Sequence, residues 1–110
     1  MPALAQTAAE VTKGKMLFLQ CSACHSVVKG APNKVGPNLN GMFGAKIGTR
    51  AAFNYSPAMK ASTVKWDDKT LDAFIAKPQA VVPGTRMAFG GVSNPDSRKA
   101  IIAYLRDATK

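Results

Sequence analysis

The chain has little histidine, cysteine and acidic charge. Its 110 residues include one histidine, two cysteines and six acidic side chains. These three Cys and His side chains are too few for a structural zinc site, which usually needs four ligands. No apolar run approaches the roughly 20 residues that a membrane-spanning helix needs, so we expect a soluble protein that does not span a membrane.

Positive charge, in contrast, is abundant. Fifteen lysines and arginines give a formal net charge of +9, which favours an anionic partner such as nucleic acid, an anionic membrane surface or an acidic protein surface. The basic residues are scattered, without a nucleic-acid-binding motif or an aromatic stacking platform, so we expect no nucleic acid partner. The alternative is a solvated basic surface without a dedicated partner.

The length of the chain indicates a single domain. We expect residues 1–9 to form a flexible N-terminal extension and residues 10–110 to form the domain. Within the extension, Ala3-Leu4-Ala5 has the small-x-small pattern of a signal-peptidase site, from which we hypothesise export. An ordinary alanine-rich terminus explains the same residues equally well.

Helix signals occur at four places, each opened by a residue type that caps helices. Thr7-x-x-Glu10, for example, is a capping-box pattern. We predict helices over residues 8–20, 57–61, 68–77 and 95–108. Because no convincing strand pair is present, the predicted class is all-α. Residues 30–53 and 79–93 are rich in glycine and proline and predict long loops, which need something central to pack against, such as a large flat cofactor.

The strongest motif is Cys21-Ser22-Ala23-Cys24-His25, a C-x-x-C-H haem-attachment sequence. Two thiols at this spacing lie on one side of a helical turn and can reach both vinyl groups along one porphyrin edge. His25 can then turn a ring nitrogen toward the iron. A redox-active C-x-x-C would normally accompany a βαβ pattern, which is missing, and a simple disulfide would leave His25 without a role. We therefore predict one covalently bound haem c.

The sequence pattern leaves several candidates for the ligand on the second face of the iron. A second histidine is excluded because the chain has only one, so methionine, lysine or an open site remain. Among five methionines, Met87 stands in a loop punctuated by proline and glycine, and Met59 is the reserve candidate. The alternative is that Met87 only fills a gap in the core.

The whole pattern resembles the class I c-type cytochromes, the family of mitochondrial cytochrome c and its bacterial relatives. The resemblance implies the all-α cytochrome c fold, in which the first and last helices cross, with Gly14 and Phe18 against Ile101 and Tyr104. It rests on Lys13-Gly14-Lys15, the Cys21–His25 motif, Lys34–Leu39, Gly41, Phe43-Gly44, Tyr55, Trp66, Pro83–Met87 and Ile101–Leu105.

The same resemblance implies roles for individual residues. His25 and Met87 would be the axial ligands of the iron. The carbonyl of Pro37 would accept a hydrogen bond from the second ring nitrogen of His25 and fix its orientation. Tyr55 and the indole of Trp66 would bond the haem propionates, the alternative being ordinary core aromatics with a polar handle.

Three positions depart from the family pattern. Ala45 stands where the family often has an arginine near the propionates, and Arg50 is a nearby substitute in the sequence. Met59 replaces an asparagine of the distal network, and Phe74 replaces a tyrosine that often touches the ligating sulfur. We expect a less polar pocket with an altered reduction potential.

The resemblance implies a carrier of single electrons and not an enzyme. A haem peroxidase or a gas sensor, each vacating Met87, are the alternatives. Partners would be acidic surfaces of redox proteins such as quinol–cytochrome c reductase and a terminal oxidase or photosynthetic reaction centre. We expect a monomer in the bacterial periplasm or, alternatively, the mitochondrial intermembrane space. The predicted partner-binding residues are Lys15, Lys34, Lys77 and Arg86.

Overall fold

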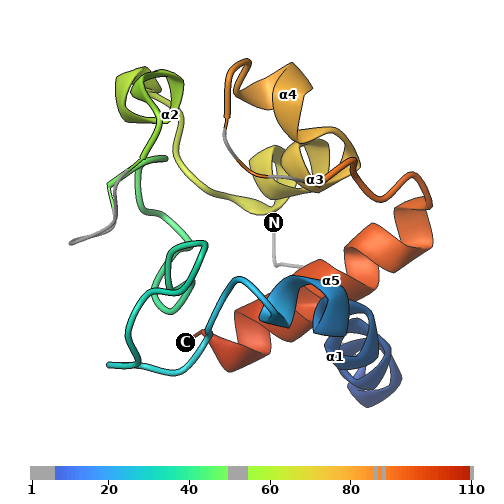
Figure 1. Cartoon of the computed structure of the whole chain (residues 1–110). Coiled ribbons are helices and arrows are strands. Elements are labelled where there is room, and N and C mark those ends of the chain that lie inside the picture. The colour runs from blue at the N-terminus through green and yellow to red at the C-terminus, as the bar shows by residue number, and fades with distance from the viewer. Residues whose placement is uncertain (1–6, 50–54, 86, 88, 110) are drawn as a thin grey trace.

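The computed structural model describes residues 7–49, 55–85, 87 and 89–109, and these form an all-α arrangement. The helices are α1 (Ala8–Ser22), α2 (Pro57–Ala61), α3 (Asp68–Ala76), α4 (Pro78–Val81) and α5 (Pro95–Ala108). In Figure 1, α1 and α5 pack at one side, α3 and α4 lie above them, and long loops occupy the side beneath α2. The described part contains one isolated antiparallel bridge, Lys46 with Lys65, and no named strand, which confirms the predicted class.

The first and last helices cross, as the family resemblance implied. A side chain on Gly14 would overlap the carbonyl oxygen of Ala100, so only glycine lets the two backbones approach this closely. One turn further on, the ring of Phe18 lies 5.3 Å from that of Tyr104, and Ile101 is buried beside them. This crossing explains a glycine that would otherwise weaken the middle of α1.

Local capping interactions start the helices where the sequence predicts them. The Thr7 hydroxyl accepts from the amide of Glu10, whose side chain in turn accepts from Thr7, so the predicted capping box is confirmed. Asp67 caps α3 by accepting from Thr70, and Asn94 caps α5. The four predicted helices are confirmed to within two residues at each end. The prediction missed α4, because a single turn opened by Pro78 leaves no periodic signal.

Helix α1 begins at Ala8, so Ala8 and Ala9 belong to a helix. Residues 1–6 lie outside the described residues, and the division into an extension over 1–9 and a domain over 10–110 stays a prediction. None of the helices in the described ranges is long and apolar enough to cross a membrane.

One buried amide organises the loop that follows α1. The Asn38 side chain donates to the carbonyls of Val28 and Ala31, at 2.7 and 2.9 Å, and its oxygen accepts from the amide of Asn40. The backbone N–H of Asn38 donates to the side-chain oxygen of Asn33. These bonds join Asn38 to four other residues, so the loop is held in shape without regular structure.

Candidate functional site

A large cavity of about 480 Å³ lies among α1, α3, α5 and the loops. This volume falls within the range typical of cofactor and small-molecule sites. Its described walls are mostly aliphatic, aromatic and thioether side chains, and Lys46 is the one lysine or arginine among them. A cavity of this kind suits a large apolar group that needs few polar contacts.

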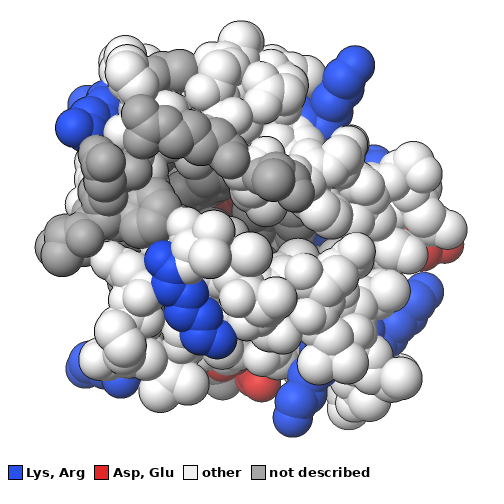
Figure 2. Space-filling view, in the orientation of Figure 1, with Lys and Arg blue, Asp and Glu red and all other residues white. Residues whose placement is uncertain are grey.

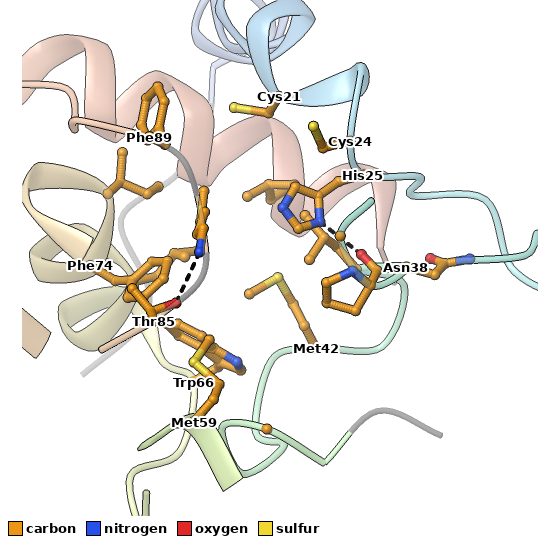
Figure 3. A pocket seen from close by; sticks show the side chains of 18 of the residues that line it. Cys21, Cys24, His25, Asn38, Met42, Met59, Trp66, Phe74, Thr85 and Phe89 are labelled. Carbon is orange, nitrogen blue, oxygen red and sulfur yellow. Dashed lines mark hydrogen bonds between the residues drawn. The ribbon is translucent and has the colours of Figure 1, made fainter. Parts of the chain in front are cut away.

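The end of α1 supplies both cysteines to one edge of this cavity. Cys21 lies in the last turn, and the amides of Cys24 and His25 donate to its carbonyl at 3.0 and 2.9 Å, which continues the helical turn. Figure 3 shows Cys21 and Cys24 along the same edge, with His25 next to them. The cysteines are not joined in a disulfide, and burial, followed by the neighbouring Cys24, raises the pKa of the Cys21 thiol. Two adjacent free sulfurs are therefore available to a bound group.

The imidazole of His25 points into the cavity and is held from behind. Its Nδ1 lies 2.8 Å from the carbonyl oxygen of Pro37, so Nδ1 carries the hydrogen and donates it, while Nε2 keeps its lone pair. Burial lowers the pKa of His25, and the bond to Pro37 opposes this shift only in part. The ring is therefore neutral at pH 7, which is the form that binds a metal.

Gly36 gives the ring its space, and the sequence analysis assigned this residue no role in the site. A side chain at position 36 would overlap the ring atoms of His25. The Gly36 amide also donates to the carbonyl of Cys24, at 2.8 Å, which ties the segment to the cysteine motif. The only sequence feature that could have drawn attention to Gly36 is its position directly before Pro37.

Met87 also lies on the cavity wall. Met87 is half-buried, lines the cavity and packs against a cluster formed by Ile47, Phe74 and Val82. Its backbone amide donates to the Thr85 hydroxyl, at 3.4 Å. In Figure 3, Phe74, Thr85 and Phe89 lie across the pocket from His25. Two further methionines, Met42 and Met59, also line the cavity.

Tyr55 and Trp66 both line the cavity, and Tyr55 is buried. The ring of Trp66 meets that of Phe74 edge-to-face at 5.0 Å. Ala45 and Lys46 occupy the wall where the family often has an arginine, whereas Arg50 lies outside the described residues. The place of Lys46 on the cavity wall was not predicted, because one exposed lysine among many has no distinguishing sequence pattern.

The predicted partner-binding residues are only partly described. Lys15, Lys34 and Lys77 are exposed, and Arg86 lies outside the described residues. The ammonium of Lys34 donates to the carbonyl of Ser22, the last residue of α1, at 3.0 Å. On the face in Figure 2 the basic side chains lie apart from one another. Lys34 thus has a capping contact besides its positive charge.

These residues fit a covalently attached porphyrin. The cavity is large and apolar, two free sulfurs lie on one edge, and a neutral histidine held by a carbonyl lies beside them. Among the described residues, no group of three or more His, Cys, Asp or Glu side chains is arranged so that it could hold a metal ion by itself.

Comparisons with known proteins agree with this geometry. The family model described as Cytochrome c matches residues 11–109. The chain is 48% identical over 103 residues to a cytochrome c2 of Rhodomicrobium vannielii, covering 94% of this chain and 82% of the relative. It is 46% identical over 98 residues to a cytochrome c of Ulva intestinalis, covering 88% of each. A cytochrome c2 of Rhodoplanes tepidamans is 47% identical over 96 residues, covering 87% of this chain and 90% of that protein.

Proposed function

Since this chain belongs to the cytochrome c family, we propose that it carries single electrons between membrane redox complexes with its haem iron held by His25 and Met87. The family binds one haem c covalently through Cys-x-x-Cys-His, which Cys21, Cys24 and His25 provide here, and its members are electron carriers. The haem supplies an iron that alternates between the ferrous and ferric states. The finer assignments below rest on this chain's own residues.

One observation carries the proposal: the His25 ring, fixed by Pro37, and Met87 lie on walls of the same apolar cavity. The hydrogen bond orients the imidazole and raises its basicity as a ligand. A methionine sulfur is a soft ligand and raises the reduction potential relative to harder ligands. With both side chains as ligands no coordination position is left open, which favours a carrier over a peroxidase or a gas sensor.

Polar groups on the cavity wall have a separate role in the proposal. Tyr55 and Trp66 would bond the haem carboxylates with their hydroxyl and indole N–H groups, and both side chains line the cavity. Lys46, on the same wall beside Ala45, would supply the positive charge that the family places there as arginine. These hydrogen bonds and the charge of Lys46 would offset the free-energy cost of taking the haem carboxylates out of water.

The partners in this proposal are acidic surfaces of quinol–cytochrome c reductase and of a terminal oxidase or photosynthetic reaction centre. The formal charge of +9 supports electrostatic steering, with Lys15, Lys34 and Lys77 as exposed contributors and Arg86 as a fourth. Relatives include bacterial cytochromes c2 and eukaryotic cytochromes c. We infer a monomer working in the bacterial periplasm, with the mitochondrial intermembrane space as the alternative.

The ligand assignment is tested by absorption of the oxidised protein in the far red, where a sulfur-to-iron charge-transfer band reports methionine ligation. We expect this band in the wild type and its loss, with fast cyanide binding, in Met87→Ala. Met59→Leu is the matched control, because Met59 lines the same cavity, and it should keep the band. A wild type without the band, or a Met87→Ala protein that retains it, would refute the assignment.

The partner assignment is tested by electron-transfer rates with purified membrane complexes over a salt series. We expect rates that fall steeply as ionic strength rises, because screening weakens charge steering beyond about 10 Å at 0.1 M salt. Lys77→Glu should reduce the rate at low salt, whereas Lys69→Glu on the exposed face of α3 is the matched charge control. Rates that do not change with salt would favour a surface whose charge only confers solubility.

A further inference from the structure

The segment that presents Met87 begins with a tight turn. The amide of Thr85 donates to the carbonyl of Val82 at 3.0 Å, and Gly84 has a φ of +87°, a conformation that glycine adopts without strain. Val82 is buried against Phe74 and Ile47, which anchors the start of the turn in the core. Its far end leads to Met87, which is only half-buried.

One side chain spans this turn from outside. The Oε1 of Gln79 accepts from the Gly84 amide, and its Nε2 donates to the Thr85 carbonyl, both at 2.9 Å. Gln79 itself lies in α4, next to the fully buried Pro78. A single amide group therefore links an anchored helix to two consecutive backbone positions of the turn.

The same turn contacts the backbone of Met87. The Thr85 hydroxyl accepts from the Met87 amide, so hydrogen bonds run from Gln79 through Thr85 to Met87. Displacing Met87 from the cavity together with Gly84 and Thr85 would break the bonds to Gln79. Each such bond contributes modestly, and losing two together changes an equilibrium by about tenfold.

We propose that Gln79 is a positioning residue that holds Gly84 and Thr85 in the turn and thereby keeps Met87 at the iron. This inference rests on the proposed function, because it takes Met87 to be the ligand. The residue type matters, since the Gln79 amide group both donates to Thr85 and accepts from Gly84, whereas a lysine only donates and an ionised glutamate only accepts. No pattern in the sequence predicts this role of Gln79, which depends on its two bonds to the turn.

The test uses the full-length haem-loaded protein, with cyanide as the probe of the sixth coordination position. In Gln79→Ala we expect cyanide to bind the oxidised protein about tenfold faster than in the wild type. Gln79→Lys keeps a donor for Thr85 and should show a smaller increase. Gln79→Glu places a carboxylate oxygen against the carbonyl oxygen of Thr85. The rate of cyanide binding should therefore increase more in Gln79→Glu than in Gln79→Lys. The far-red sulfur-to-iron band should persist in each variant at neutral pH.

Amide hydrogen exchange at Gly84 provides a readout that does not depend on the iron ligand. It should be faster in Gln79→Ala, while exchange in α5 stays unchanged. Lys69→Ala, which truncates an exposed side chain of α3, is the control and should change neither measurement. Unchanged cyanide binding in Gln79→Ala, or a change matched by an equal loss of global stability in urea, would overturn the inference.

Failure of the inference can be told apart from failure of the proposed function. A wild type that lacks the sulfur-to-iron band would refute Met87 as the ligand and, with it, the link from Gln79 to the iron. A wild type that shows the band, with Gln79→Ala indistinguishable from it in cyanide binding, would refute only the role of Gln79.

Discussion

Two regions of this molecule are held together by different means. The terminal helix pair, α1 with α5, packs through buried apolar side chains such as Phe18, Ile101 and Leu105. The loop wall, made of the described residues within 24–48 and 78–93, is held by bonds between backbone groups and by side chains that each bond to several backbone groups, as at Asn38 and Gln79. Phe18, Ile101 and Leu105 line the cavity as well, but they also belong to one buried cluster, whereas the loop wall depends more on the group bound in the cavity.

The largest expected effect comes from removing the haem attachment. Without haem, the apolar walls of a cavity of about 480 Å³ lose their partner, which costs free energy whether the cavity stays empty or fills with water. A typical domain is stable by only about 5–15 kcal/mol and tolerates little loss of this kind. We therefore expect the Cys21→Ala/Cys24→Ala double variant, produced without haem, to be largely unfolded by circular dichroism and amide proton dispersion.

Ser22→Ala is the control for that experiment, because it lies between the cysteines and leaves both sulfurs in place. It should retain haem and cooperative unfolding. A haem-free double variant that unfolds as cooperatively as the wild type would show that the loop wall is stable by itself, and the contrast between the two regions would then be wrong.

The second prediction weakens the helix pair instead. Gly14→Ala should destabilise the haem-loaded protein by about 2–3 kcal/mol, because the added methyl group overlaps the carbonyl of Ala100. Helix propensity alone predicts the opposite sign, a gain of about 1 kcal/mol. Urea unfolding measures the difference, and Lys13→Ala, an exposed neighbour, should stay within about 0.5 kcal/mol of the wild type. A stabilised Gly14→Ala would contradict the observed crossing.

The third prediction makes the cavity that the loop wall faces more polar. Phe74 and Met59 both line the cavity, and Phe74→Tyr or Met59→Asn would add a polar group there. Polar surroundings favour the more highly charged ferric state, so we expect the reduction potential to fall by roughly 20–60 mV, where 59 mV is a tenfold change for one electron. Redox titration measures the shift, with Ile75→Val as an apolar control. If neither polar variant moves the potential, the dry pocket has no electronic consequence.

The smallest expected effect is a pH dependence at Asp67, the cap of α3. The hydrogen bond from the Thr70 amide lowers the pKa of Asp67 below its ordinary value of 3.8. The native state then binds fewer protons than the unfolded state, so this stabilisation is present above pH 4 or so and is lost as the pH falls through the native pKa. Asp67→Asn should lack this dependence, and its stability difference from the wild type should shrink toward low pH in urea titrations. A difference that is constant with pH would contradict the capping argument.

Helix boundaries were predictable because their causes are local. Thr7, Asp67 and Asn94 each bond to an amide two or three residues ahead, within reach of a sequence pattern. Helix α4 was missed, since four residues carry no period and the segment reads as a loop. Pro78, its first residue, is fully buried in the folded molecule. Burial of this kind depends on the tertiary structure and cannot be predicted from a local sequence pattern.

The attachment motif is likewise local, and Cys21, Cys24 and His25 are recognisable within five consecutive residues. Assigning roles to Pro37 and Met87 needed the family resemblance, because both lie far from the motif along the chain. The structure brings Pro37 to the ring of His25 and Met87 to the wall of the same cavity. Whether Met87 binds the iron stays a prediction for the spectroscopic test.

The residues alone therefore indicate the helices, the single domain and the covalent haem, since each depends on neighbours a few positions apart. Tertiary structure alone shows that Gly36 makes room for an imidazole, that Lys46 lies on the pocket wall and that Gln79 spans a turn. These contacts join segments that are apart in the sequence, and no local pattern distinguishes Gly36, Lys46 or Gln79 from other residues of the same type. Physical proximity, which no spacing rule encodes, distinguishes them.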